Sequence, residues 1–445
     1  MKTIFFVIAT RPRVNFILRT DTYRLLKERG YRLVIFSPFS QDLDFQKEFG
    51  GVNVVFEPLC PLGKIGNLLN NYRNEALLFR HPTLKLAKFI HKVITRRYQT
   101  AENFWQKAKK ILKQPFLWLV WLCRSEKFWN SLEDIFISEC CDYFKKYQPS
   151  AVVLATAGAE GQDVPFLIAA RRFGVPAAAI DNNIDVFEFR YFSQPRKIAQ
   201  WALFGEVHKQ EAMAVQGLPA DILSVTGPAR YDHHFNFQPI PREEFFRKIG
   251  ADPSKKLITY GAKIPKMYPH NADVLEIILQ GVDAGKFGPA QLFVRFDPGH
   301  DPSQYGNLLN KIIWEKADEQ SHREHVANLL YHSDVVISIG STFCCEAVLL
   351  DRPSLWVGFD GYKTYSDPKE SYGYIYNLPM FQIIDAIGGI PLVKSPAELV
   401  GWISKYLKNP KLDSEKRAAL VRQEYYKNDG QAGKRVADLI ESLMQ

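Results

Sequence analysis

The sequence predicts an α/β protein made of two domains, each built on a parallel sheet. Short runs rich in Val, Ile, Leu and Phe recur along the chain, and segments with helical spacing of apolar residues lie between many of them. These runs end in glycine or small polar residues, which is typical of buried parallel strands followed by crossover helices. A length of 445 residues is ample for two such domains.

The first half begins with an apolar strand that runs into a basic loop at Arg11. Gly30 and Gly174 mark helix ends, because glycine readily adopts the left-handed conformation that closes a helix. The expected strands are residues 2–9, 31–37, 52–56, 151–156, 175–181, 201–205 and 222–227, and the expected helices are residues 21–30, 164–174 and 208–217.

The second half repeats this plan after a proline-containing connection at residues 237–245. We therefore expect a first domain at 1–225 and a second at 226–445, with a closing helix at 430–445 that packs back towards the first domain. The expected strands of the second half are residues 256–263, 290–301, 335–339 and 354–357, and the expected helices are 271–285, 343–350, 395–409 and 413–443, the last one broken at Asp429 and Gly430.

A basic insertion, residues 64–147, interrupts the alternation and is helical by composition and rich in Trp and Phe. Residues 73–127 contain 13 Lys/Arg and 3 Asp/Glu, a net charge of +10, while the whole chain carries +9. Basic amphipathic helices with aromatic residues suit an anionic membrane surface. The same composition also fits an insertion that packs on its own domain, or a groove for an anionic polymer. No nucleic-acid-binding motif accompanies the charge, so nucleic acid is not an expected partner.

The cysteine usage and the hydropathy indicate the compartment. The six cysteines form no CxxC and no Cys/His metal spacing, which favours a reducing cytoplasm. No apolar run approaches the roughly 18 to 20 residues that span a bilayer. We expect a cytoplasmic protein, with the inner face of the membrane as the alternative if the basic insertion binds lipid. No EF-hand loop or histidine cluster predicts a metal, and no cofactor is expected.

The most informative stretch is residues 334–357. A β-branched run ends at Gly340, Ser341 and Thr342 follow as helix N-caps, and the next helix is halted at Asp351-Arg352-Pro353. Small polar residues at the carboxyl end of a parallel strand mark the usual ligand site of an α/β sheet. The backbone amides and the positive end of the helix would suit a phosphate, and Glu346 would suit a sugar diol. The structural alternative is that Ser341 or Thr342 only caps the helix.

Other polar residues follow the predicted strands of the second half. Gly261 would let a ligand approach the backbone closely, and Lys263, Arg295 and His300 would neutralise phosphate charge. Together with the Gly340 turn they suit a nucleotide diphosphate. For the basic residues the alternative is a surface charge, and His300 also suits a turn.

The first half offers an acceptor side. Glu160 and Asp163 are candidate general bases, since a carboxylate tuned by burial could deprotonate an acceptor hydroxyl. Arg11, Asp181 and Asn182 also lie at predicted strand ends and are assigned to the acceptor side. Asp163 could instead cap the following helix, and Asp181 could form an Asx turn. Two sheets that face one another would form a central cleft.

Four stretches carry a family resemblance: IDNNIDVFEF, SVTGPARYDHH, LYHSDVVISIGSTFCCEAVLLDRPSLWVGFD and NDGQAGKRVADLIESL. With them the chain resembles the GT-B glycosyltransferases, and in particular a bacterial surface-polysaccharide group related to the CDP-glycerol glycerophosphotransferases and UDP-N-acetylglucosamine 2-epimerases. The chain departs from the group where Ile180 replaces a frequent Trp and where FDPGHD replaces a frequent His-Pro pair. It departs from the epimerases where Arg13 replaces an acidic residue, which counts against epimerase chemistry.

The resemblance implies a GT-B fold of two Rossmann-like domains and a metal-independent transfer of a sugar from a nucleotide-activated donor. The donor would carry UDP or a CMP/CDP unit, and the acceptor would be a glycan or a lipid-linked molecule of a surface polysaccharide. Ser341 and Thr342 would contact phosphate, and Glu346 the ribose or the sugar. The alternatives are polyol-phosphate transfer from a CDP-alcohol, sugar-nucleotide epimerisation, and non-catalytic binding of a nucleotide sugar.

Overall fold

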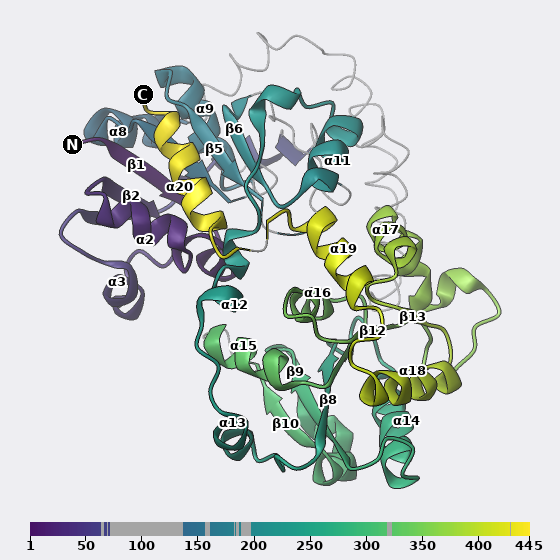
Figure 1. The fold of residues 1–445 in the computed structure, drawn as a ribbon. Helices are drawn as coiled ribbons and strands as arrows, with labels where there is room; N and C mark the ends of the chain where they lie inside the picture. The colour runs from purple at the N-terminus through teal and green to yellow at the C-terminus, as the bar shows by residue number, and fades with distance from the viewer. Residues whose placement is uncertain are drawn as a thin grey trace. The chain divides into compact units, whose positions relative to one another are not determined.

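The computed structural model folds into two compact units, each with its own parallel sheet (Figure 1). The structure describes residues 1–63, 66–68, 70–71, 137–155, 161–181, 183, 187, 197–317, 323–427 and 429–445. The first unit contains the described residues up to Asp232 together with Gln423–Gln445, and the second contains those from His233 to Arg422. The predicted α/β class with two parallel sheets is confirmed.

The first sheet has seven strands in the order β3-β2-β1-β4-β5-β6-β7, and every neighbouring pair is parallel. The direction of winding reverses between β1 and β4, which is the switch point where α/β sheets usually bind ligands. The strands are β1 (Thr3–Val7), β2 (Arg32–Phe36), β3 (Val54–Glu57), β4 (Ala151–Leu154), β5 (Ala177–Ile180), β6 (Gln200–Leu203) and β7 (Leu223–Val225).

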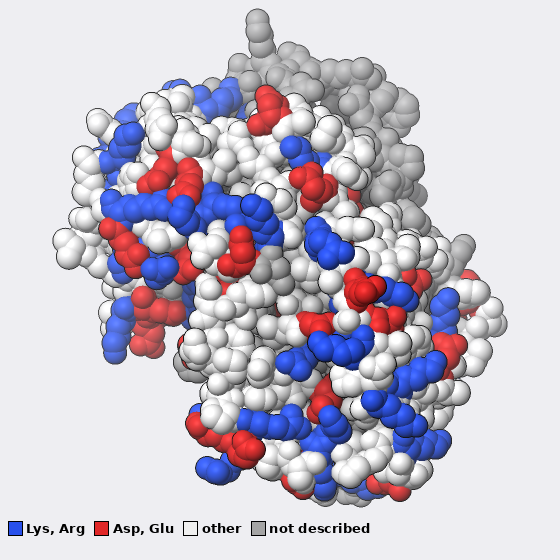
Figure 2. All heavy atoms as spheres, viewed as in Figure 1, with Lys and Arg blue, Asp and Glu red and all other residues white. Residues whose placement is uncertain are grey.

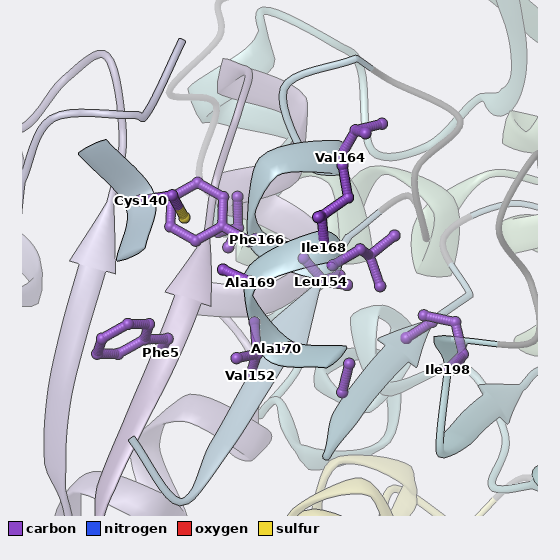
Figure 3. Packing of buried hydrophobic residues seen from close by; sticks show 14 of the residues in the cluster. Phe5, Cys140, Val152, Leu154, Val164, Phe166, Ile168, Ala169, Ala170 and Ile198 are labelled. Atoms are coloured by element: carbon purple, nitrogen blue, oxygen red, sulfur yellow. The ribbon is translucent and has the colours of Figure 1, made fainter. Parts of the chain in front are cut away.

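Helices cover both faces of the first sheet because successive strand residues point to opposite sides. Phe5, Val152 and Leu154 pack against α8 and α9 (Figure 3), whereas Ile4 and Phe6 belong to a second cluster with α2 and α20. The helices are α1 (Arg11–Arg13), α2 (Asp21–Glu28), α3 (Leu43–Phe49), α8 (Ser138–Tyr147), α9 (Val164–Phe173), α11 (Glu206–Gln216) and α20 (Ala432–Ser442), with a π-helical turn at Val14–Leu18.

Helix α20 joins the first unit through tight packing on α2. Gly433 makes this packing close, because a Cβ placed there would lie 2.8 Å from Asp21 Cβ and 3.0 Å from the Thr22 nitrogen. The Thr22 hydroxyl donates to the Gly433 carbonyl at 3.1 Å. The Asp232 carboxylate accepts the backbone N–H groups of Ala432 and Gly433 at 3.1 and 2.6 Å. The start of α20 is therefore held by side chains from two distant parts of the first unit.

The second sheet has six strands in the order β10-β9-β8-β11-β12-β13, again all parallel. Its winding reverses between β8 and β11. The strands are β8 (Lys256–Ala262), β9 (Ala290–Phe296), β10 (Ile313–Lys316), β11 (Val335–Ser338), β12 (Ser354–Val357) and β13 (Leu392–Val393). The helices are α12 (His233–Asn236), α13 (Arg242–Ile249), α14 (Asn271–Asp283), α15 (Arg323–His332), α16 (Thr342–Leu349), α17 (Pro379–Ile387), α18 (Pro396–Lys408) and α19 (Ser414–Glu424), with a 3-10 segment η8 (Tyr372–Asn377).

Charges of both signs are interspersed over the face that Figure 2 shows. Arg29, directly after α2, forms ion pairs with Asp438 and Glu441 of α20 at 2.8 and 2.7 Å. Residues 72–136 of the predicted basic insertion lie outside the described residues, so its helical character stays a prediction. In the part of the chain that the structure describes, no helix combines the length and the hydropathy needed to cross a membrane. Cys60, Cys140, Cys141, Cys344 and Cys345 are buried thiols.

Candidate functional site

The candidate site of the second unit lies at the switch point between β8 and β11. These two strands pair in parallel, with Ser338 opposite Gly261, so their carboxyl ends lie next to each other. The chain continues from β8 into Lys263 and from β11 into Gly340, Ser341 and Thr342. Lys263 and the residues Gly340, Ser341 and Thr342 therefore come from two adjacent loops, at the position where open α/β sheets bind ligands.

The turn from β11 into α16 has the geometry that its sequence predicts. Gly340 has φ +51°, a left-handed conformation that side-chain-bearing residues rarely adopt. Ser341 is the N-cap of α16, and its side chain accepts the Phe343 N–H at 3.3 Å. The capping interpretation of Ser341 is thus observed, and it is compatible with an anion site, because the positive end of α16 remains at the strand end.

Lys263 is the cation that this site has available. Its side chain is half-buried, and its backbone carbonyl accepts the Asn271 side-chain amide at 2.8 Å. Among the described residues, no ion pair or side-chain hydrogen bond engages its ammonium group. An uncompensated lysine beside a helix N-terminus favours binding of an anion there.

Arg295 and His300 have protein partners instead. Arg295 forms an ion pair with Glu315 on the neighbouring strand β10, and His325 lies 2.6 Å from the other Glu315 oxygen. Burial acts to raise the pKa of Glu315, but the hydrogen bond with His325 and the charge of Arg295 outweigh it and hold that pKa below its usual value. His300 is buried against Phe296 and shares a 2.7 Å hydrogen bond with Tyr305; burial lowers its pKa.

Gly261 and Glu346 each lie next to a side chain of another element of the second unit. A Cβ on Gly261 would lie 2.9 Å from the Phe343 ring, so the missing side chain makes room for that ring. Glu346 on α16 faces His234, with 3.4 Å between Oε2 and Nε2, and 14% of its side chain is exposed. His234 itself is fully buried. The Glu346 carboxylate is therefore positioned next to a buried histidine, and part of the Glu346 side chain stays accessible to a ligand.

The acceptor-side candidates of the first unit are only partly described. Asp163 is the N-cap residue of α9 and is fully buried, yet its side chain makes no capping hydrogen bond. Arg11 is exposed, forms an ion pair with Asp42 at 3.2 Å and lies over the Phe39 ring. Glu160 and Asn182 lie outside the described residues.

Asp181, directly after β5, belongs to a buried charge cluster that sequence analysis missed. His208 on α11 has its Nδ1 3.6 Å from Asp181 and its Nε2 3.4 Å from Glu424, and all three side chains are at least 95% buried. Burial disfavours the imidazolium, but the carboxylates of Glu424, Asp181 and Glu211 outweigh it and raise the pKa of His208 to about 9. The cluster therefore carries a protonated histidine at neutral pH. Its partners are far apart in sequence, so no local signal marks them.

Within the described ranges, no group of three His, Cys, Asp or Glu side chains is placed to hold a metal ion. The carboxylates of Asp181 and Glu424 and the imidazole of His208 form the ion pairs described above.

No known family model matches the chain, and no curated protein sequence is similar to it. Solved structures are similar over almost the whole length. The UDP-GlcNAc 2-epimerase of Neisseria meningitidis bound to UDP-GlcNAc has a TM-score of 0.55 at 13% identity, covering 99% of this chain and 100% of that one. A putative UDP-N-acetylglucosamine 2-epimerase of Listeria monocytogenes has a TM-score of 0.58 at 13% identity, covering 99% and 96%.

The wall teichoic acid polymerase TagF is similar to the same extent, with a TM-score of 0.54 at 12% identity over 100% of this chain and 89% of that one. At such identities the similarity shows the fold alone. Together with the two switch-point sheets, it confirms the predicted fold: this chain has the two-domain GT-B architecture that glycosyltransferases and UDP-GlcNAc 2-epimerases share.

Proposed function

We propose that the protein transfers a sugar from a nucleotide sugar to a hydroxyl group of a glycan or lipid-linked acceptor. The observation that carries the proposal is the left-handed turn at Gly340, which leads into the capped N-terminus of α16 next to the loop of Lys263, at the switch point of the second sheet. Similar solved structures with this fold contain UDP-GlcNAc or UDP, which supports a nucleotide-sugar ligand for the same fold.

In this proposal the second unit binds the donor. The amides at the start of α16 and the Ser341 and Thr342 side chains hold the diphosphate, and Lys263 offsets its charge. Glu346, kept in place by His234, accepts hydrogen bonds from ribose or sugar hydroxyls. Arg295 and His300, which have protein partners, support the surrounding structure and contact the donor only if those partners are exchanged.

The acceptor would bind to the first unit near Arg11, Asp181 and Asn182. The acceptor oxygen attacks the anomeric carbon of the donor, and the bond from that carbon to the diphosphate oxygen breaks. The diphosphate leaves with the electron pair of that bond, and cationic and backbone N–H groups stabilise it. The acceptor proton passes to a carboxylate, for which Glu160 and Asp163 are the candidates.

The decisive experiment incubates the protein with nucleotide sugars and lipid-linked or glycan acceptors and identifies both products. Transfer from a nucleoside-diphosphate sugar requires release of the nucleoside diphosphate and a lengthened acceptor, and transfer from a CMP-sugar requires release of CMP and a lengthened acceptor. Glu160→Gln and Asp163→Asn are the matched variants for the base, and the true base is the one whose loss lowers turnover by about 100-fold or more. Nucleotide binding without release from any donor would contradict the proposal and indicate a binding protein.

Polyol-phosphate transfer is a second candidate, favoured by the similarity to TagF. The same experiment with a CDP-alcohol separates the two, because CMP rather than a nucleoside diphosphate would be released. Epimerisation is distinguished by a changed sugar configuration in the absence of any acceptor.

A further inference from the structure

Buried tyrosines gather around the carboxyl end of the second sheet. Each is at least 92% buried: Tyr260, Tyr268, Tyr305, Tyr372 and Tyr376. A phenol hydroxyl that leaves water must find a hydrogen-bond partner, since an unpaired one keeps the full cost of desolvation. The partners of these hydroxyls therefore indicate which of them serve the fold and which one is available to a ligand.

Four of the five hydroxyls have protein partners. Tyr260 donates to the Asn271 side chain at 2.8 Å, Tyr268 to the Phe359 carbonyl at 2.6 Å and Tyr376 to the Val357 carbonyl at 2.8 Å, while Tyr305 shares a 2.7 Å hydrogen bond with His300. These four hydroxyls fix the loops that follow β8, β9 and β12.

Tyr372 is the exception. Its hydroxyl is buried and has no hydrogen-bond partner among the described residues. The residue is nevertheless held firmly at the start of η8. Its N–H donates to the Asp360 carboxylate at 3.0 Å, and its ring packs edge-on against Tyr268 with 5.3 Å between ring centroids. The hydroxyl is therefore fixed in place before any ligand arrives.

The Tyr372 hydroxyl reaches the Gly340 turn. A Cβ built on Gly340 would lie 3.7 Å from the Tyr372 oxygen and 3.3 Å from the Phe381 ring. Gly340 is the residue that leads from β11 to the N-terminus of α16. A buried donor without a partner, the left-handed glycine and a helix N-terminus thus converge on one point.

We infer that Tyr372 binds a phosphate group of the ligand at the Gly340–Thr342 turn, donating its hydroxyl hydrogen to a phosphate oxygen. The inference rests on the proposed function for the identity of the ligand as a nucleotide diphosphate. A neutral phenol complements the Lys263 charge, because it supplies a directed hydrogen bond where the ammonium supplies an undirected attraction. Tyr372 would then select for phosphate, and not for the base or the sugar.

The test compares Tyr372→Phe with Tyr268→Phe, which removes a hydroxyl from the same tyrosine cluster. Calorimetric titrations use UDP, CDP, inorganic diphosphate and uridine as probes. We expect Tyr372→Phe to lower the affinity for UDP, CDP and inorganic diphosphate by about 10- to 100-fold and to leave the affinity for uridine unchanged. Tyr268→Phe should leave all four affinities unchanged.

Thermal unfolding without ligand provides an independent readout. Tyr372→Phe should keep or raise the Tm, because it removes a buried hydroxyl that lacks a partner. Tyr268→Phe should lower the Tm, because it leaves the Phe359 carbonyl without its donor. A Tm loss in Tyr372→Phe as large as that of Tyr268→Phe would show that its hydroxyl bonds within the protein, against the inference.

The outcomes separate this inference from the proposed function. Unchanged diphosphate and nucleotide affinity in Tyr372→Phe overturns the inference and leaves the proposed function standing. Diphosphate binding that depends on Tyr372, without binding of any nucleotide, supports the inference and contradicts the nucleotide-sugar proposal. A wild-type protein that binds neither nucleotides nor diphosphate overturns both.

Discussion

At the scale of single residues, two buried histidines lie next to carboxylates of the candidate sites. His234 holds Glu346 in the second unit, and His208 joins Asp181 and Glu424 in the first. A buried carboxylate next to a histidine has a more restricted orientation than a solvated surface carboxylate. These two pairs make the roles of Glu346 and Asp181 open to separate tests.

Glu346→Ala should weaken donor binding by about 1 to 3 kcal/mol, because charged hydrogen bonds to a diol are lost. His234→Gln should produce a smaller loss, since it leaves the carboxylate present but less well oriented. Calorimetric titration with UDP measures both, and Glu324→Ala, an acidic position on α15, is the control. Equal nucleotide affinity in Glu346→Ala and the wild type would refute the assignment.

His208 predicts a loss of stability at alkaline pH. Its pKa is about 9 in the folded protein and 6.5 when unperturbed, so its contribution is fully present below pH 6.5 and disappears as the pH rises through 9. The loss amounts to about 3 kcal/mol between those values. Thermal unfolding at pH 6 and pH 9.5 should show it in the wild type, and His208→Gln should reduce the difference.

The control for this experiment is His332→Gln. Burial lowers the pKa of His332, so its charging opposes folding at acidic pH and cannot produce an alkaline loss. If the alkaline loss persists unchanged in His208→Gln, the buried cluster around Asp181 is not its source.

At the scale of helices and strands, the contact between α2 and α20 depends on one missing side chain. Gly433→Ala should destabilise the first unit by about 1 to 3 kcal/mol, because its Cβ would press on Asp21 and on the backbone of Thr22. Gly401→Ala on α18 is the matched control, since nothing lies within 4 Å of a Cβ there. That change should stabilise by about 0.5 to 1 kcal/mol through helix propensity.

Urea unfolding of both variants measures the difference. Equal free energies of unfolding for Gly433→Ala and Gly401→Ala would mean that α2 and α20 accommodate the added methyl group without a loss of stability. That result would contradict the tight contact.

Most elements could be predicted from the sequence, because their signals are local. The strand, glycine and capping residues of 335–350 predict β11, the turn and α16 almost to the residue. The edge strands β10 and β13 were missed, since β10 is only partly buried and β13 has two residues, so neither leaves a clear apolar run. The π-helical turn at Val14–Leu18 was also missed, because nothing in its composition distinguishes it from a loop or an α-helix.

The site was predictable only as far as its signals are local. The Gly340 turn and Lys263 could be found because each directly follows its strand. Tyr372 lies 32 residues beyond Gly340 and His234 lies 112 residues before Glu346, so their proximity is a product of the fold. The sequence suggested that Gly261 lets a ligand approach the backbone, but it could not show that the Phe343 ring of α16 lies against this glycine, because the two residues are far apart in the chain.

At the scale of the whole molecule, the uneven charge predicts a binding surface outside the two sheets. The positive excess falls in residues 73–127, while the face that Figure 2 shows mixes both signs. We predict that replacing Lys107, Lys109, Lys110 and Lys113 by Glu lowers binding to anionic vesicles, most clearly at low salt. Vesicle co-sedimentation measures this. The control reverses the exposed lysines Lys255, Lys286, Lys405 and Lys408.

The membrane hypothesis fails if the unmodified protein does not sediment with anionic vesicles. It also fails if the control variant loses binding as strongly as the insertion variant, since attraction would then follow net charge and not the insertion.

The make-up of the first unit has a consequence for biosynthesis. Its core includes Val436, Ala437 and Ile440 of α20, which cover Ile4 and Phe6 on β1, yet α20 leaves the ribosome only after the entire second unit. Until then the nascent chain exposes one apolar face of its first sheet to solvent or to a chaperone. The described part of the second unit runs without interruption by the first unit from His233 to Arg422, so it can finish folding earlier. A translation stall or premature stop before α20 would therefore yield a protein whose second unit is complete and whose first unit is incompletely folded and prone to aggregate.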